Sequence, residues 1–160
     1  MSLKIYNLKD KMEYLEEVLT LEHNEWSNDK SNNNWLDKKI KQFTEQMNRN
    51  DFCKLVLLDK DDLIGFISIF PHDSEEYPNL TPWYSTMYVK TEYRGCKYSK
   101  LLNDAILDEA KNRGFKTIYL KTTLENYYEK FGAKYMETLK NGEKLYYIDI
   151  PKNKKIWING

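Results

Sequence analysis

The chain has 160 residues and a mass of 19.3 kDa, which is the size of one compact domain. Apolar residues make up 41% of the sequence, which is enough for a hydrophobic core and argues against an intrinsically disordered chain. Its 25 basic and 25 acidic residues cancel, and this balance argues against a general nucleic-acid binder or a polybasic membrane protein.

The N-terminal third combines a short strand with two amphipathic helices. Residues 3–6 alternate between apolar and polar side chains, as in a strand. Apolar residues at helical spacing predict helices over residues 12–26 and 35–47. The polar residues 27–34 (SNDKSNNN) predict a loop between these two helices.

In the middle of the chain, apolar runs favour strands. Residues 52–58 and 63–70 predict an antiparallel hairpin around the polar turn at residues 60–62. A loop with three prolines, residues 71–82, leads to a third strand at residues 83–89.

A strand–helix–strand unit follows. The helix is predicted from one apolar stripe and ends near Gly114, where a C-terminal cap is expected. The next strand, residues 117–120, should run parallel to residues 83–89, because such crossovers are right-handed and join parallel strands. The stripe consists of Leu101, Leu102, Ala105, Ile106 and Ala110.

The last elements are a short helix over residues 124–131 and a hairpin around Asn141-Gly142, a dipeptide typical of tight β-turns. Together the elements predict an α+β fold, with one mixed sheet of about six to seven strands flanked by about four helices. The two cysteines and two histidines show no spacing typical of a metal site. The apolar runs are too short to cross a bilayer of about 30 Å, and no signal peptide is recognisable. We therefore expect one cytoplasmic domain over residues 1–160 that binds no metal, nucleic acid or membrane.

Residues 87–102 (MYVKTEYRGCKYSKLL) form the first segment that could carry chemistry. A helix that begins just after a strand presents free N–H groups and about half a positive charge, which together hold phosphate well. Arg94 and Lys97 add full charges, and Gly95 lets the backbone approach a ligand closely. An ordinary solvated loop between a strand and a helix fits the same residues.

This segment resembles the cofactor loop of the GNAT superfamily of acyl-CoA-dependent N-acetyltransferases. That family has Arg or Gln, two residues, Gly, one residue, and then Gly or Ala. Residues 127–133 (YYEKFGA) resemble the family's Phe-Tyr-Glu-Lys-Leu-Gly-Phe segment, and the order of predicted elements matches over nearly the whole chain. The loop pattern falls on Arg94, Gly95, Cys96, Lys97, Tyr98 and Ser99.

The resemblance implies a single GNAT-like domain with acetyl-CoA as co-substrate. Acetyl-CoA would lie in a V between the strand that ends near Val89 and the strand at residues 117–122. The acetyl group would pass directly, in a ternary complex, to a primary amine, which we expect to belong to a small molecule. The residues expected to bind acetyl-CoA are Met87, Val89, Arg94, Gly95, Cys96, Lys97, Tyr98, Ser99 and Asn126.

Two positions depart from the family pattern. Lys97 stands where glycine is usual, and Ser99 stands where Gly or Ala is usual. We expect Lys97 to adopt a positive φ, at a cost of about 1 kcal/mol, which a bond to a phosphate oxygen could offset. A second interpretation therefore stays open: a non-catalytic acyl-CoA-binding or sensing module with a degenerate phosphate loop.

Tyr128 matches the family tyrosine that protonates the leaving sulfur. A phenol with a pKa of about 10 is protonated at neutral pH, and its acidity is close to that of a thiol, whose pKa is about 8.5. It can therefore donate a proton to the leaving sulfur. A purely structural, packed tyrosine is the alternative. The general base is not evident. Many members of the family use a glutamate on the third strand, but the corresponding position here falls near Ser85 and Thr86, and neither residue is a base. A water chain, His72 or an acid of the following loop remain candidates, the acids being Asp73, Glu75 and Glu76.

The resemblance places the acceptor site at the first two helices, the loop between them and the loop before the third strand. Trp26, Trp35 and Tyr84 are the candidate substrate-binding residues, because aromatic walls suit an organic cation. The two tryptophans fit equally well as apolar anchors of their helices. The apolar tail Ile156-Trp157-Ile158 leaves a homodimer open. Nearby acids that would favour a cationic amine are Glu22, Glu25, Asp29 and Glu75.

Overall fold

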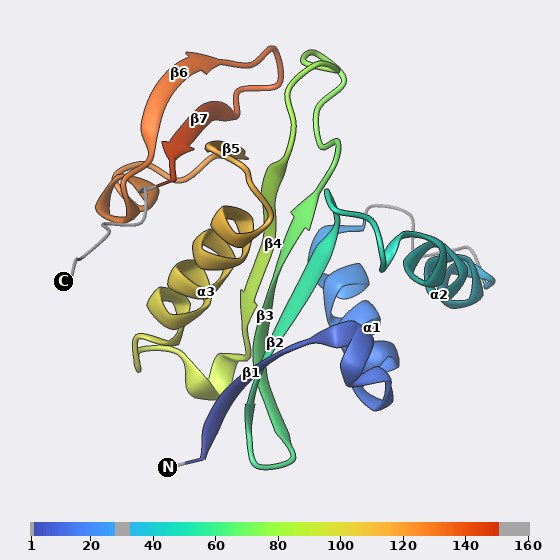
Figure 1. The fold of residues 1–160 in the computed structure, drawn as a ribbon. Coiled ribbons are helices and arrows are strands. Elements are labelled where there is room, and N and C mark those ends of the chain that lie inside the picture. The colour runs from blue at the N-terminus through green and yellow to red at the C-terminus, as the bar shows by residue number, and fades with distance from the viewer. Residues whose placement is uncertain (1, 28–32, 151–160) are drawn as a thin grey trace, which may run out of the picture.

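The computed structural model describes residues 2–27 and 33–150. Within this part, seven strands form one mixed sheet in the order β1-β2-β3-β4-β5-β7-β6 (Figure 1). Three α-helices pack on the sheet: α1 (Leu15–Trp26), α2 (Trp35–Gln46) and α3 (Tyr98–Asn112). The strands are β1 (Leu3–Asn7), β2 (Cys53–Asp59), β3 (Asp62–Phe70), β4 (Trp83–Val89), β5 (Thr117–Thr122), β6 (Lys134–Thr138) and β7 (Lys144–Asp149).

The sheet is covered on both faces, with α3 on one side and α1 and α2 on the other (Figure 1). Alternate side chains of β2 serve the two layers: Leu55 and Leu57 pack toward α3, whereas Val56 and Leu58 pack toward α1 and α2. Because both faces are buried, β2 and β3 appear in the sequence as continuous apolar runs rather than alternating ones.

Strand β4 holds two irregularities that shape the centre of the molecule. Its register with β3 shifts between Phe66 and Ser68, which places a bulge at Thr86, a residue with a φ of 46°. Its pairing with β5 is parallel, as predicted, and is limited to Trp83 with Tyr119. Beyond that pair β4 and β5 separate, so that the sheet opens into a V (Figure 1).

The predicted mixed sheet is confirmed, whereas the described residues contain three α-helices instead of about four. The expected helix over residues 124–131 shrinks to a 3-10 turn at Tyr128–Phe131, because Asn126 adopts a φ of 58° that a right-handed helix cannot contain. No helix among the described residues has the length and apolar character needed to cross a membrane. Asp29 and the apolar tail at residues 156–158 lie outside the described residues.

Candidate active site

A cavity of about 400 Å³ lies between the end of β4 and the start of α3. We call it the loop cavity. It brings together most of the residues expected to bind acetyl-CoA. Two of the expected residues, Cys96 and Asn126, are exposed and do not line it. Its lining includes Met87, Tyr88, Val89, Arg94, Gly95, Lys97, Tyr98, Ser99, Leu124, Tyr127 and Tyr128.

The end of β4 turns backbone groups toward this cavity. The N–H of Lys90 donates to the carbonyl of Ile64 on β3, at 2.9 Å. Because hydrogen bonding alternates along an antiparallel pair, the neighbouring Val89 directs its N–H and C=O to the opposite edge, where β5 is absent. There Arg94 Nε donates to the Val89 carbonyl at 2.8 Å. Arg94 thus fixes the turn after β4, and the Val89 N–H remains directed into the V.

The start of α3 has the features of an anion site. Lys97 is the N-cap residue and adopts a φ of 65° and a ψ of 23°, which confirms the expected left-handed conformation. Gly95 has a φ of 86°, and a Cβ added there would meet no atom within 4 Å. No acidic residue lies in the first turn of α3, so the positive end of the helix dipole is not neutralised locally. These donors and this space fit a pyrophosphate.

Tyr128 is held at the wall of the loop cavity by aromatic contacts. The rings of Tyr84 and Tyr127 meet it edge-on, with centroid distances of 5.7 and 4.8 Å. Burial raises the pKa of Tyr128 to about 12, and Tyr127 contributes in the same direction. Within the described residues, the Tyr128 hydroxyl has no hydrogen-bond partner, so its proton is available to a bound molecule.

A larger cavity of about 840 Å³ adjoins the loop cavity. We call it the transfer cavity. The two share Glu25, Met87, Leu124 and Tyr128, so Tyr128 stands where they join. A molecule held along the loop cavity would therefore meet one held in the transfer cavity beside the Tyr128 hydroxyl. The other residues that line the transfer cavity are Trp26, Phe70, Asp73, Tyr84, Ser85, Thr86, Leu120, Lys121, Thr122, Thr123 and Glu143.

Among the acids of the loop before β4, the structure places Asp73 in the transfer cavity. Ser85 Oγ donates to its carboxylate at 3.2 Å. Burial raises the pKa of Asp73, and the charge of Lys121 and the bond from Ser85 oppose this shift. Glu75 and Glu76 do not line the transfer cavity but an adjoining surface hollow, which shares Asp73 and Lys121 with it. There Glu76 accepts from the N–H of Lys140.

The three candidate substrate-binding residues fall in different places. Trp26 lines the transfer cavity at the end of α1, with its ring 6.2 Å from that of Tyr88. Tyr84 also lines it but is only 4% exposed, so it presents little surface to a substrate and mainly packs against Tyr128. Trp35 does not line it, because its ring stacks on His23 at 3.9 Å.

Sequence reasoning missed two charged residues of the transfer cavity, Lys121 on β5 and Glu143 before β7. Both lie in short polar stretches that carry no motif. Their position depends on the pairing of β5 with β7, which places Lys121 opposite Leu145. Only the three-dimensional arrangement therefore assigns them to this cavity.

Comparison with known proteins identifies one family and many solved structures that share this fold. The sequence profile of the acetyltransferase (GNAT) family matches residues 15–133. Among curated proteins, none matches the chain significantly in sequence.

Several solved structures share the fold over nearly the whole chain. An aminoglycoside 6'-acetyltransferase of type Ii is 22% identical, with a TM-score of 0.66, and the match covers 96% of this chain and 99% of that one. The protein yncA of Salmonella typhimurium, solved with acetyl-CoA, is 14% identical, with a TM-score of 0.71 and coverages of 96% and 97%. A point mutant of the spermidine N-acetyltransferase SpeG of Vibrio cholerae is 18% identical, with a TM-score of 0.66 and coverages of 92% and 94%.

Proposed function

Since the chain belongs to the acetyltransferase (GNAT) family, we propose that it transfers the acetyl group of acetyl-CoA directly to a primary amine of a small cationic molecule. The family makes the chain an acetyltransferase with acetyl-CoA as its co-substrate. Residues 1–160 would act as a single domain. The observation that carries the proposal is the position of Tyr128 at the junction of the loop cavity and the transfer cavity.

The loop cavity is the proposed binding site of acetyl-CoA. Backbone N–H groups between Gly95 and Ser99 would hold the pyrophosphate, with the Lys97 ammonium beside it. The backbone of Met87 and Val89 at the open edge of β4 would hold the pantetheine arm and the acetyl carbonyl. Arg94 contributes by keeping the turn closed through its bond to Val89.

Tyr128 is the proposed general acid. Bound acetyl-CoA supplies an activated acetyl carbon, on which the amine nitrogen replaces the sulfur while the C–S bond breaks and its electron pair leaves with the sulfur. Tyr128 gives its proton to that sulfur, which avoids release of a bare thiolate. The ammonium substrate loses two protons in total: one restores Tyr128 and one passes to solvent.

Asp73 is the proposed general base. An alkyl ammonium has a pKa of about 10.4, so forming the neutral amine at pH 7 costs roughly 4 to 5 kcal/mol. A buried carboxylate whose pKa is raised accepts that proton more readily than an ordinary aspartate does. Ser85, which donates to Asp73, would keep the carboxylate directed into the transfer cavity.

The charge of the transfer cavity favours a cationic acceptor. Among the described residues, its lining contains the acids Glu25, Asp73 and Glu143 against the single cation Lys121. Trp26 adds an exposed aromatic face that suits an organic ammonium. Two structures of the same fold are named for transfer to aminoglycosides and to spermidine, which are small polyamines in the chemical sense.

An amine panel tests the proposal. The protein would be mixed with acetyl-CoA and, in separate reactions, with spermidine, an aminoglycoside, a hydroxylated monoamine that carries one charge, and a short peptide with a free N-terminus. Release of the CoA thiol and the mass of the product report acetylation, and turnover of a cationic small molecule is expected. Preference for the peptide would overturn the small-molecule assignment. Binding of acetyl-CoA without turnover of any amine would support the sensing module instead.

A further inference from the structure

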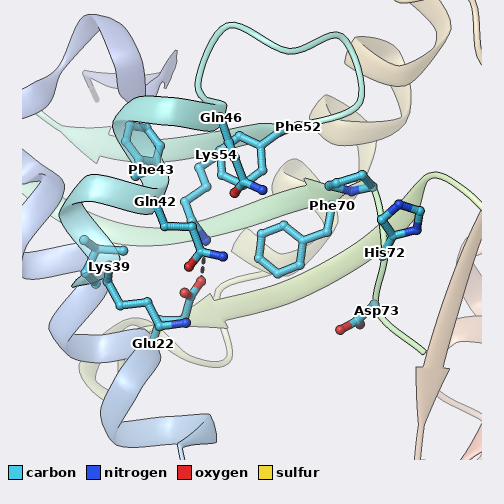
Figure 2. Close-up of a pocket in the computed structure, with 12 residues that line it drawn as sticks. Glu22, Lys39, Gln42, Phe43, Gln46, Phe52, Lys54, Phe70, His72 and Asp73 are labelled. Carbon is cyan, nitrogen blue, oxygen red and sulfur yellow. Dashed lines mark hydrogen bonds and ion pairs between the residues drawn. The ribbon is translucent and has the colours of Figure 1, made fainter. Parts of the chain in front are cut away.

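A buried cation lies between α1 and the sheet. Lys54 on β2 is 3% exposed, and its ammonium donates to the carboxylate of Glu22 on α1 (Figure 2). It also donates to Ser68 Oγ on β3 at 3.0 Å, directly across the strand pair. The ring of Phe70 lies 4.7 Å from the same nitrogen. Burial lowers the pKa of Lys54, and the charge of Glu22 and its hydrogen bond oppose this shift. The Ser68 oxygen and the face of the Phe70 ring also favour the ammonium form.

The hydrogen-bonded chain continues from Lys54 into β4. Ser68 Oγ, which is fully buried, lies 2.6 Å from Thr86 Oγ1. Thr86 forms the bulge of β4, precedes Met87 and lines the transfer cavity. A continuous row of side chains therefore connects Glu22 and Lys54 with the wall of the cavity in which the acetyl group is transferred.

The chemistry of Lys54 sets the direction of these hydrogen bonds. When Lys54 is charged, as its ion pair with Glu22 favours, its ammonium has no lone pair and Ser68 accepts from it. Ser68 has a single hydrogen, which it then donates to Thr86 Oγ1. The hydrogen of the Thr86 hydroxyl has no acceptor in the part of the chain that the structure describes. Thr86, which lines the transfer cavity, thereby keeps its own hydrogen to donate to a bound molecule.

An interior ion pair needs a reason beyond stability. Removing two charges from water costs free energy, and apolar side chains of similar volume often stabilise a fold equally well. A positive φ is also unfavourable for a β-branched residue such as Thr86. Apolar side chains could fill the positions of Lys54, Ser68 and Thr86. What the three polar residues provide instead is a hydrogen-bonded row that ends in the Thr86 hydroxyl and orients it.

We propose that the Thr86 hydroxyl donates a hydrogen bond to the acetyl carbonyl oxygen during transfer, and that Lys54 and Ser68 are positioning residues that fix its direction. This inference rests on the proposed function. A cationic amine offers no lone pair to a donor, whereas the carbonyl oxygen gains negative charge as the nitrogen adds. A donor oriented before the reaction stabilises that charge without reorganisation.

Vibrational spectroscopy tests the inference without knowledge of the acceptor. Acetyl-CoA labelled with ¹³C at the acetyl carbonyl would be bound to the parent protein, and its carbonyl band recorded by difference infrared spectroscopy. The hydrogen bond from Thr86 should lower the frequency of the bound carbonyl. In Thr86→Val, which keeps the shape but lacks the hydroxyl, the band should move back toward the frequency of free acetyl-CoA.

Two further variants separate orientation from simple packing. Thr86→Ser keeps a hydroxyl and should retain the lowered frequency. Ser68→Ala removes the orienting bond, leaves the Lys54–Glu22 pair in place and should reverse part of the shift. The affinity for acetyl-CoA, measured by calorimetry, should change by less than about threefold in Thr86→Val, whereas kcat should fall about 100-fold, as for the loss of one oxyanion donor.

The outcomes are distinct. An unchanged carbonyl band in Thr86→Val would overturn the inference while leaving the proposed function intact. Failure of the parent protein to bind acetyl-CoA would overturn the proposed function and this inference with it. A band that shifts equally in Thr86→Ser and Thr86→Val would also contradict the inference, because it would show an effect of packing rather than of the hydroxyl.

Discussion

The ring of Tyr84 meets the ring of Tyr128 edge-on, with 5.7 Å between the centroids and 81° between the planes. Tyr84 belongs to β4 and Tyr128 follows β5, so the contact spans the gap that opens between these strands. Tyr84 is 4% exposed, and its hydroxyl lies 3.7 Å from the sulfur of Met87. The buried ring thus holds Tyr128 where the loop cavity and the transfer cavity join.

Replacement of Tyr128 by phenylalanine tests the role of its proton. We expect kcat to fall roughly 100-fold to 10,000-fold, the range typical of a lost general acid. The affinity for acetyl-CoA should stay the same, because the ring and its contacts with Tyr84 remain. Steady-state kinetics and calorimetry measure the two quantities. Tyr127→Phe is the matched control and should keep kcat; equal losses in both variants would point to packing instead.

The alkaline side of the pH profile tests the environment of Tyr128. Transfer requires the protonated phenol, so activity is lost as pH rises through the pKa of Tyr128. Burial raises that pKa from 10.0 to about 12, so kcat should show no decline as pH approaches 10. Measurement of kcat, rather than kcat/KM, avoids the ionisation of the free amine. A decline centred near pH 10 would contradict a buried general acid.

Much of the fold is predictable because it is encoded locally. Alternating and continuous apolar runs predict the strands, the stripe that ends near Gly114 predicts α3, and Asn141-Gly142 predicts the last hairpin. The left-handed conformation of Lys97 could also be predicted, because this residue falls on a glycine position of the loop pattern that the segment resembles. Each of these features depends on residues that are close together in the sequence.

The rest depends on pairing between distant residues. Lys54 sits inside an apolar run and gives no sign that Ser68 lies opposite it. The bulge at Thr86 arises from a register shift against β3, which no local pattern records. Asp73 was one of several loop acids, and only the folded loop brings it to Ser85. Trp35 was expected near the acceptor, but its helical stripe places it against His23.

Replacement of Asp73 by asparagine should change activity and stability in opposite directions. The folded-state pKa of Asp73 lies above its ordinary value, so the ionised form at neutral pH destabilises the native state. Asparagine keeps an acceptor for Ser85 without the charge and should raise the melting temperature at pH 7. That gain should disappear as pH falls below the ordinary aspartate pKa, where both states of the parent are protonated.

The same variant should lose activity, because the amine no longer has its base. In the parent, kcat should fall with decreasing pH as Asp73 becomes protonated, at a pH above the ordinary aspartate pKa of 3.8. Asp73→Asn should lack that acid limb. Glu76→Gln, outside the transfer cavity, is the control and should keep it. An acid limb retained in Asp73→Asn would assign the base to another group.

Gly65→Ala should destabilise the protein through a steric clash beside β4. A Cβ at this position would lie 2.3 Å from the Tyr88 carbonyl oxygen and 3.2 Å from Leu102 Cδ1. Backbone cannot move away cheaply, so the free energy of unfolding should fall by about 3 kcal/mol or more. Gly95→Ala meets no atom and should cost only about 1 kcal/mol, for its positive φ. Chemical denaturation distinguishes the two; equal losses would contradict the close approach.

Substitutions of Lys97 separate two roles of this residue: its positive φ, which shapes the loop, and its ammonium charge, which faces the proposed pyrophosphate site. Lys97→Gly removes the cost of a positive φ in the folded state, but it also raises the conformational entropy of the unfolded state. Because the two effects oppose each other, the free energy of unfolding should change by less than about 1 kcal/mol. Loss of the ammonium should weaken acetyl-CoA binding about two- to fivefold, because the side chain is exposed and screened.

Lys97→Asn completes this test, because asparagine tolerates a positive φ without carrying charge. If the ammonium binds a phosphate oxygen, both variants should bind acetyl-CoA equally weakly, and the salt dependence measured by calorimetry should be shallower than in the parent. Tighter binding by Lys97→Gly than by the parent would mean that the lysine crowds the pyrophosphate. The departure from glycine would then lower the affinity of the loop instead of adding a contact to it.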